Sequence, residues 1–315
     1  MPNTDAVASR RPVPAVHDGF LASLERRVID DRVQAFRRFG PRGGRPLVLL
    51  HGLMDNSAGF APLLAALEAD APLEHDVIAP DWRGHGDSDA TPGAYWFPNY
   101  LADLEALLDT LGVTEPAVLV GHSMGGQVAS LYAGARPDRV AGLVTLDSLN
   151  VPDSDAADAP ARYRDWLDTL AHGAAAAERV YDSIDAFAGR LARRYPELDA
   201  ATRYYLAESW LRPIADGRWQ LRADPAHRRR MPYGFRADEA AALWREVRCP
   251  VLCIDGGRSP ATSFVSAETL AARRACFARI GHRTLAGCGH MLHLQDAPAV
   301  AAELRSFVRR LDADR

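Results

Sequence analysis

The chain has 315 residues, of which 48% are hydrophobic and 25% charged, with a formal net charge of −4. This length fits one large α/β domain carrying an insertion, and the apolar share allows a sizeable core. All basic residues are arginines, which excludes Ser-Lys dyads, Schiff-base chemistry and pyridoxal attachment. The arginines form no long stripe, so we expect no nucleic-acid surface, and the cluster at residues 228–230 is interpreted as a solvated loop.

The four cysteines, at positions 249, 253, 276 and 288, lack the CxxC spacing of a zinc or redox site. We therefore expect reduced cysteines in or beside the core. Residues 1–16 contain no apolar segment of the kind found in signal peptides, and no run in the chain is apolar for long enough to cross a membrane. These features predict a cytoplasmic protein without membrane contact.

Along the chain, residues 1–16 are rich in Pro, Ala and polar residues and are expected to be disordered. Residues 20–29 and 33–39 carry β-type patterns and predict an antiparallel pair. From there on, short apolar runs alternate with helical patterns, which predicts a mostly parallel sheet with helices on both faces. The expected strands are 47–50, 76–79, 117–120, 140–146, 251–254 and 283–286, and the expected helices are 60–68, 99–111, 125–135, 267–280 and 298–311.

One stretch interrupts this alternation. Residues 149–235 contain helical patterns at 159–171, 183–194 and 200–211, with a brief extended piece at 219–222 and no convincing sheet strand. An insertion of this size after the sixth strand is typical of a cap over the carboxyl edge of the sheet, where open α/β sheets bind ligands. We expect core segments at 17–148 and 236–315, with a helical cap at 149–235 between them.

The strongest chemical signal is GHSMGG at residues 121–126. It follows a strand pattern and precedes a helix pattern, which is the context of the G-x-S-x-G nucleophile elbow. The glycines are required because a serine held in a sharp strand-to-helix turn leaves no room for β-carbons two residues on either side. Ser123 is therefore the candidate nucleophile, against the alternative of an ordinary glycine-rich turn.

Two other loops belong to the same edge of the predicted sheet. LVLLHG at 47–52 ends a strand where this architecture forms part of an oxyanion hole, so the amides of Leu53 and Met124 are the expected donors to a developing oxyanion. His51 is expected to position that loop. In GCGHMLH at 287–293, His290 is the candidate general base and His293 is expected to be structural.

With LVLLHGLMDN, APDWRGHGDSD, VGHSMGG and GCGHMLHL in this order, the chain resembles the α/β-hydrolases. It is similar to their serine hydrolase-like branch in its HG loop and in YWFP at 95–98. In this superfamily the fifth residue after Ile254 is usually the acid of the catalytic triad, but here it is Ser259. Some members carry the acid one strand earlier, and Asp147 follows that strand.

Asp147 is thus the expected triad acid. Asp255 is the alternative, although it leaves its strand four residues too early for the usual loop, and a dyad or an inactive protein is the third reading. The order Ser123, Asp147, His290 agrees with the chain order of this fold.

The resemblance implies a serine hydrolase that cleaves carboxylic esters through an acyl-enzyme, without metal or organic cofactor. We expect a small-molecule substrate, an ester of an apolar acid, under the cap. The expected pocket residues are Met54, Trp96, Phe97, Leu149, Trp166 and Met291.

Three other functions use the same scaffold. An acyltransferase or thioesterase would use the same residues with another acceptor. A carbon–carbon bond hydrolase or lyase would need polar cap groups, for which Arg162, Arg164 and Arg212 are candidates. A non-catalytic binding protein is indicated only by Ser259.

Overall fold

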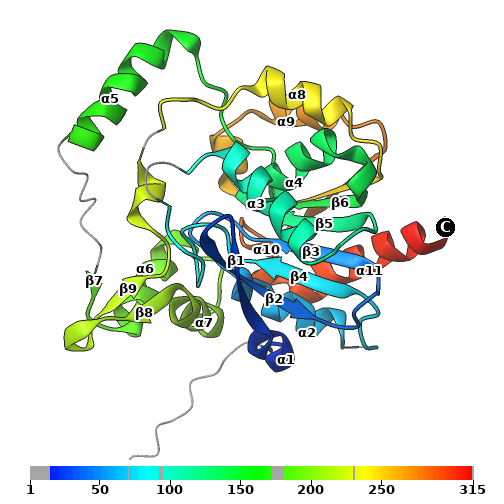
Figure 1. Cartoon of the computed structure of the whole chain (residues 1–315), viewed down its shortest axis with the longest axis horizontal. Coiled ribbons are helices and arrows are strands. Elements are labelled where there is room, and N and C mark those ends of the chain that lie inside the picture. Colours follow the sequence, from blue (N-terminus) through cyan, green and yellow to red (C-terminus); the bar gives the residue numbers. More distant parts are fainter. Residues whose placement is uncertain (1–14, 70, 92–94, 172–179, 230, 314–315) are drawn as a thin grey trace, which may run out of the picture.

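The computed structural model describes residues 15–69, 71–91, 95–171, 180–229 and 231–313. Its centre is an eight-stranded sheet in the order β1-β2-β4-β3-β5-β6-β10-β11 (Figure 1). β2 is antiparallel to both of its neighbours, and the other pairs are parallel. The strands are β1 (Leu24–Ile29), β2 (Arg32–Phe39), β3 (Pro46–Leu50), β4 (Asp76–Pro80), β5 (Ala117–His122), β6 (Val140–Leu146), β10 (Val251–Gly256) and β11 (Ile280–Leu285). The mostly parallel sheet is confirmed.

Helices cover both faces of this sheet. The parallel strands are apolar at successive positions because alternate side chains enter different cores. Val48 and Leu50 of β3 pack in the cluster that contains α3 (Phe97–Thr110), α4 (Met124–Ala135) and α8 (Ala237–Arg245). Leu47 and Leu49 pack on the opposite face with α2 (Ala61–Leu67) and α11 (Ala297–Ala313). The sheet is therefore the middle of three layers, with helices packed on both of its faces.

Two predicted elements extend too far at one end, and the strand expected at 283–286 begins earlier, as β11 (Ile280–Leu285). Residues 20–29 are not one strand: α1 (Asp18–Ala22) comes first, because the ring of His17 accepts a hydrogen bond from the amide of Phe20 and Phe20 is buried beside α2. The helix expected at 267–280 ends earlier, as α9 (Ala267–Arg274), and turns bring the chain into β11 at Ile280. α8 was not predicted.

Residues 149–235 contain the three expected helices, α5 (Ala159–Ala171), α6 (Ile184–Arg194) and α7 (Ala200–Trp210). They also contain a separate small sheet in the order β7-β9-β8. The strands of this sheet are β7 (Val180–Tyr181), β9 (Trp219–Leu221) and β8 (Leu211–Pro213). The sequence predicted only the extended piece at β9, because strands of two or three residues are too short to show an alternating pattern. Most of the stretch expected to be disordered, residues 1–14, lies outside the described residues.

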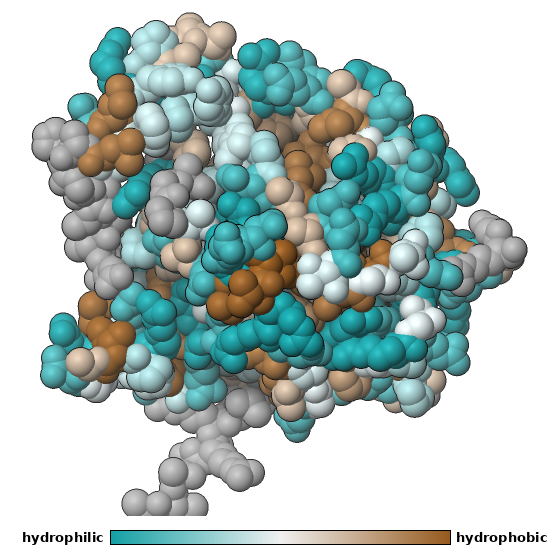
Figure 2. Space-filling view, in the orientation of Figure 1, coloured by the Kyte–Doolittle hydropathy of each residue, from teal (hydrophilic) through white to brown (hydrophobic). Residues whose placement is uncertain are grey.

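α5 lies at the edge of the molecule with apolar side chains facing outward. Tyr163, Leu167 and Leu170 are exposed and follow one another at helical spacing. In Figure 2, brown atoms gather at the upper left, where Figure 1 places this helix, beside a mostly teal and pale surface. Within the described ranges, no helix is both long and apolar enough to cross a membrane.

Candidate active site

Ser123 occupies the turn that joins β5 to α4. Its backbone has φ 50° and ψ −117°, outside the regions that a non-glycine residue prefers. Such strain costs of the order of 1–3 kcal/mol and persists where the surrounding structure enforces it. Here the helix begins at the next residue, and the amide of Ser123 donates to Leu146 of the neighbouring strand at 2.9 Å. The turn therefore holds the serine at the carboxyl edge of the sheet.

The flanking glycines are required by close backbone approach. A Cβ on Gly121 would lie 2.4 Å from the carbonyl oxygen of Gly125, and a Cβ on Gly125 would lie 2.0 Å from that of Leu50. Both distances are far shorter than any real contact, so neither position accepts a side chain. The G-x-S-x-G pattern is a steric requirement of this turn.

Three side chains from three loops form one hydrogen-bonded line. His290 follows β11 and precedes α10 (Leu292–Gln295). Its Nε2 is 3.0 Å from Ser123 Oγ, and its Nδ1 is 2.6 Å from Asp147 Oδ2. Asp147 is 1% exposed, at the end of β6. The structure thus brings together the serine, the histidine and the aspartate that the sequence indicated, at distances suited to proton transfer.

Ser259 contacts the same carboxylate. Its Oγ donates to Asp147 Oδ2 at 2.5 Å, and the amide of Gly256 donates to Oδ1 at 3.1 Å. The residue that stands where the superfamily usually has its acid therefore binds an acid supplied by the neighbouring strand. Together these donors fix the orientation of Asp147 against the histidine ring.

Asp255 is engaged elsewhere. Its carboxylate lies 3.0 Å from Arg274 and 2.9 Å from Nε2 of His282. Burial raises its pKa, and the nearby Asp147 adds to that rise although the hydrogen bond from His282 opposes it. Within the described part of the chain, its hydrogen bonds and ion pairs go to Arg274 and His282 and not to His290, so the alternative acid is not brought to the catalytic histidine.

The HG loop packs directly on the elbow. A Cβ on Gly52 would lie 3.2 Å from that of Ser123. His51 donates from Nδ1 to the carbonyl of Gly52 at 2.8 Å and accepts at Nε2 from the amide of Trp82 at 3.0 Å. Burial lowers its pKa to about 4, so it is neutral and holds the loop.

Two amides of this region are available to a ligand. Met124 begins α4, so its N–H has no partner within the helix. Among the backbone hydrogen bonds of the described residues, neither the amide of Met124 nor that of Leu53 donates to a protein group. Their roles as oxyanion donors remain a prediction, which these orphan N–H groups support.

A second group of polar residues is buried behind the histidine. His122 Nε2 lies 2.9 Å from the carbonyl oxygen of His290, and Asp55, His122 and His293 have ligand-type atoms within 4.8 Å of one another. Burial lowers the pKa of His293 to about 3 and raises that of Asp55 to about 7. Imidazole nitrogens and carboxylate oxygens are common zinc ligands, so the trio has the donor types of a metal site. His293 itself is neutral and fully buried.

Two cavities meet at Ser123. One, of about 330 Å³, is bordered mainly by aromatic and aliphatic side chains that include Trp96, Phe97 and Met124, and also by His227 and Arg229. The other, of about 620 Å³, contains His290 and Met54 and reaches the residues of α6. Leu53 and Asn150 border both. A substrate at the serine therefore has room on two chemically different sides.

Three of the expected pocket residues border neither cavity. Leu149 is buried in the core, and Met291 packs in the apolar cluster between α6, α7 and α10. Trp166 lies on α5 and is half-buried. Met54, Trp96 and Phe97 do border a cavity. The errors arise because burial and pocket exposure look alike in a sequence pattern.

The arginines considered for a dioxo substrate are also elsewhere. Arg162 donates to the backbone oxygens of Asp155 and Pro232, and neither it nor Arg164 or Arg212 borders the two cavities. The larger cavity is instead bordered by Arg190, Arg193, Arg194 and Arg228, and the smaller one by Arg229. Sequence reasoning missed the three arginines of α6 and interpreted Arg228 and Arg229 as solvated loop residues.

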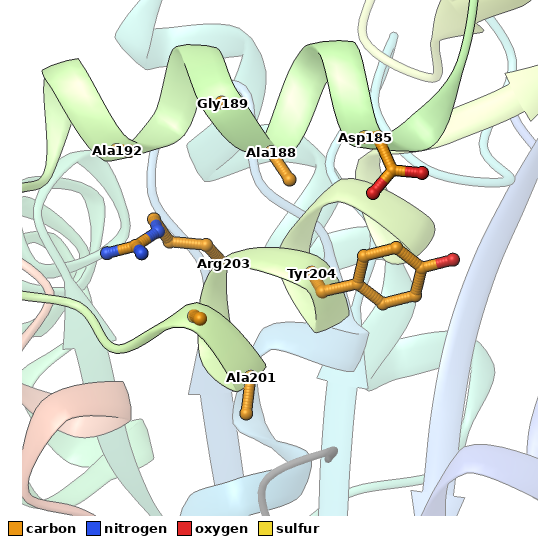
Figure 3. A pocket seen from close by; sticks show the side chains of 8 residues that line it. Asp185, Ala188, Gly189, Ala192, Ala201, Arg203 and Tyr204 are labelled. Carbon is orange, nitrogen blue, oxygen red and sulfur yellow. The ribbon is translucent and has the colours of Figure 1, made fainter. Parts of the chain in front are cut away.

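A further cavity lies between α6 and α7, away from the serine. It has a volume of about 280 Å³ and is bordered by Asp185 and Ala188 of α6 and by Arg203 and Tyr204 of α7 (Figure 3). Neither Ser123 nor His290 borders it. It takes no part in the arrangement described above.

Comparison with known proteins identifies the class. The family model of the alpha/beta hydrolase fold matches residues 45–297, so the chain belongs to this family and is an enzyme of the hydrolase type. It is similar to the 2-(acetamidomethylene)succinate hydrolase of Mesorhizobium japonicum, with 34% identity over 73% of this chain and 76% of that protein. It is 28% identical to the esterase YbfF of Escherichia coli over 84% of this chain and 92% of the relative. The crystal structure of the hypothetical protein PA1622 from Pseudomonas aeruginosa superposes with a TM-score of 0.78 and 27% identity, covering 91% of this chain and 99% of that one.

The expected branch is matched over a shorter stretch. The serine hydrolase-like protein of Danio rerio is 35% identical over 38% of this chain and 36% of its own length. That local match is consistent with the branch, and the superfamily itself is confirmed by the family model.

Proposed function

We propose that this enzyme is a serine hydrolase that cleaves carboxylic esters through an acyl-enzyme. The observation that carries the proposal is the line from Ser123 Oγ through the ring of His290 to the carboxylate of Asp147. A neutral serine is a weak nucleophile, and a base within hydrogen-bonding distance activates it as attack begins. The buried carboxylate orients the ring and stabilises its positive charge.

In the proposed mechanism, Ser123 Oγ attacks the carbonyl carbon while His290 Nε2 takes the hydroxyl proton. The amides of Leu53 and Met124 stabilise the tetrahedral oxyanion, a contribution of about 3–4 kcal/mol for a well-placed donor. The imidazolium then protonates the leaving alcohol, and the C–O bond breaks. Water, deprotonated by His290, releases the acid and restores the serine. No step requires a metal or an organic cofactor.

For the substrate, we infer an ester whose apolar acyl group enters the cavity bordered by Trp96, Phe97 and Met124. The aromatic and aliphatic lining of that cavity supports this assignment. The same residues would serve a thioesterase or an acyltransferase, which differ in leaving group or acceptor and not in the serine, histidine and aspartate. The carbon–carbon bond hydrolase is an alternative on the same scaffold: its three candidate arginines lie outside the cavities, but other arginines of α6 border the larger one.

A panel of p-nitrophenyl esters and acyl thioesters of increasing acyl length tests this proposal. We expect turnover by the wild type, none by Ser123→Ala, and the highest kcat/KM with short to medium acyl chains. Product analysis with an added alcohol separates hydrolysis from acyl transfer. Absence of turnover for every member, by a folded protein, would contradict the proposal.

We also propose that the protein acts in a reducing compartment such as the cytoplasm. Its four cysteines are free, and three of them are buried. Burial raises the pKa of the Cys253 thiol to about 12, so that group is unreactive at neutral pH. Fractionation of the native host, followed by detection of the protein, tests this location.

A further inference from the structure

Four arginines surround the larger of the two cavities at Ser123. Arg190, Arg193 and Arg194 come from α6, and Arg228 comes from the short 3-10 helix at Pro225–Arg228. These two elements are distant in the sequence, yet their basic side chains border the same cavity as the serine and His290. Among the described residues that border this cavity, none is an aspartate or a glutamate.

The positive charge of this cavity is not balanced locally. Within the described part of the chain, none of these four arginines forms an ion pair, and the guanidinium of Arg194 lies over the ring of Tyr195 at 5.7 Å. Arginines elsewhere on the surface are often paired. Examples are Arg26 with Asp87, Arg136 with Glu105, Arg139 with Asp109 and Arg248 with Asp138. In a chain of net charge −4, four uncompensated cations around one cavity form a local positive field.

Stabilisation of the helix end explains only part of this arrangement. Arg193 and Arg194 lie in the last turn of α6, where cations interact favourably with the helix dipole. Arg190 lies before that turn, and Arg228 belongs to another element. The helix dipole does not explain why these two arginines border the same cavity. Binding of one anionic ligand by both side chains does explain it.

The position of His290 indicates which part of the substrate carries the anionic group that the arginines would bind. His290 borders the arginine-bordered cavity and not the aromatic one, whereas Met124, an expected oxyanion donor, borders the aromatic one. In the proposed mechanism His290 protonates the leaving group, so the leaving group lies on its side of the serine. The acyl group then extends into the aromatic cavity.

We propose that the enzyme is selective for esters or thioesters whose leaving group carries an anionic oxyacid, a carboxylate or a phosphate, held by Arg190, Arg193, Arg194 and Arg228. This inference rests on the proposed function and specifies its substrate class. The planar guanidinium binds carboxylate and phosphate through two parallel N–H···O bonds, and the chain offers no lysine for this task. Because these side chains are exposed, they also attract anions from solution before binding.

Matched substrates test this selectivity. The reference is p-nitrophenyl butanoate, and the test compound is the butanoate of the same nitrophenol with a carboxylate on its ring. A nitrophenyl ester of glutarate places the carboxylate on the acyl side instead. A butanoyl pantetheine thioester with and without its phosphate distinguishes a phosphate preference from a carboxylate preference. At low ionic strength we expect the anionic leaving group to raise kcat/KM about tenfold in at least one pair, and the acyl-side carboxylate to give no gain.

Salt and substitution identify the arginines as the cause. In about 0.5 M NaCl the preference should fall at least about threefold, because the Debye length shrinks to a few ångströms. Arg193→Gln and Arg228→Gln should each lower the preference about threefold. Arg245→Gln is the matched control: it also removes an exposed arginine from the last turn of a helix, α8, but borders neither cavity, and it should leave the preference unchanged.

A measurement without turnover separates this inference from the proposed function. We expect Ser123→Ala, studied by calorimetry, to bind the intact ester with the anionic leaving group more tightly than the matched neutral ester. The ratio of the two dissociation constants should equal the kcat/KM preference of the wild type. Equal affinities, or a preference that survives Arg193→Gln and Arg228→Gln together, would overturn the inference, whether or not the wild type is active. Loss of turnover with retained anion preference in binding would instead contradict only the proposed reaction.

Discussion

Replacement of Asp147 by asparagine is the substitution whose effect follows most directly from the geometry. Oδ2 of Asp147 accepts from the hydroxyl of Ser259 and lies 2.6 Å from Nδ1 of His290, while Oδ1 accepts from the amide of Gly256. A carboxylate accepts all three bonds, but an amide has one oxygen and one NH₂ group. Whichever way the amide is turned, its NH₂ group meets at least one N–H or O–H donor.

The consequence for His290 is a change of tautomer. With NH₂ facing it, the ring places its lone pair on Nδ1 and its proton on Nε2, so Nε2 no longer accepts the proton of Ser123. The charge that stabilised the imidazolium is also lost. We expect kcat to fall by about 10³ to 10⁴, which corresponds to about 4–5.5 kcal/mol of transition-state stabilisation.

The assay is steady-state hydrolysis of p-nitrophenyl butanoate by wild type, Asp147→Asn and Asp255→Asn, with thermal melting to show that each variant is folded. Asp255 forms ion pairs with Arg274 and His282, so the kcat of Asp255→Asn should stay within about threefold of the wild-type value. Retention of more than a tenth of kcat by Asp147→Asn, or an equal loss in both variants, would refute the reasoning.

Three further predictions address the support of the site. Ser259→Ala removes one donor to Asp147 and should lower kcat about tenfold with little change in KM, measured with the same ester. Gly121→Ala should abolish activity and lower Tm by several degrees, since its Cβ would meet the backbone of Gly125; a melting curve and kcat equal to wild type would refute the steric argument. Burial raises the pKa of Asp55 to about 7, so the folded state holds a proton that the unfolded state, with a pKa near 3.9, has lost. Unfolding then releases a proton, and stability falls by up to about 4 kcal/mol between about pH 4 and pH 7. Asp55→Asn should remove this fall, as urea denaturation across that range would show; identical pH profiles for the two proteins would contradict it.

Much of the fold could be predicted because its signals are local and strong. Strands buried on both faces give continuous apolar runs, and the glycines of the elbow are dictated by backbone contacts at Gly121 and Gly125. The end of β6 could be matched to Asp147 because parallel strands present their carboxyl ends at one edge. The loop containing His290 follows from the same rule.

The parts that failed depend on contacts between distant segments. Nothing in the local pattern shows that Ser259 donates to the carboxylate of Asp147. Whether a large apolar residue such as Met291 is packed in a core or borders a cavity is decided by α6 and α7, not by its neighbours in the chain. The small sheet of β7, β8 and β9 has strands of two or three residues, too short for any periodicity. The arginine-bordered cavity also depends on how α6 folds over the serine.

The central claim is that Ser123 is a nucleophile activated by His290. Its most direct test is intact-protein mass spectrometry after treatment with a fluorophosphonate, followed by peptide mapping. We predict a single adduct on Ser123 in the wild type, a much slower reaction in His290→Asn, and none in Ser123→Ala. A folded wild type that remains unlabelled, or an adduct that persists in Ser123→Ala, would contradict the claim.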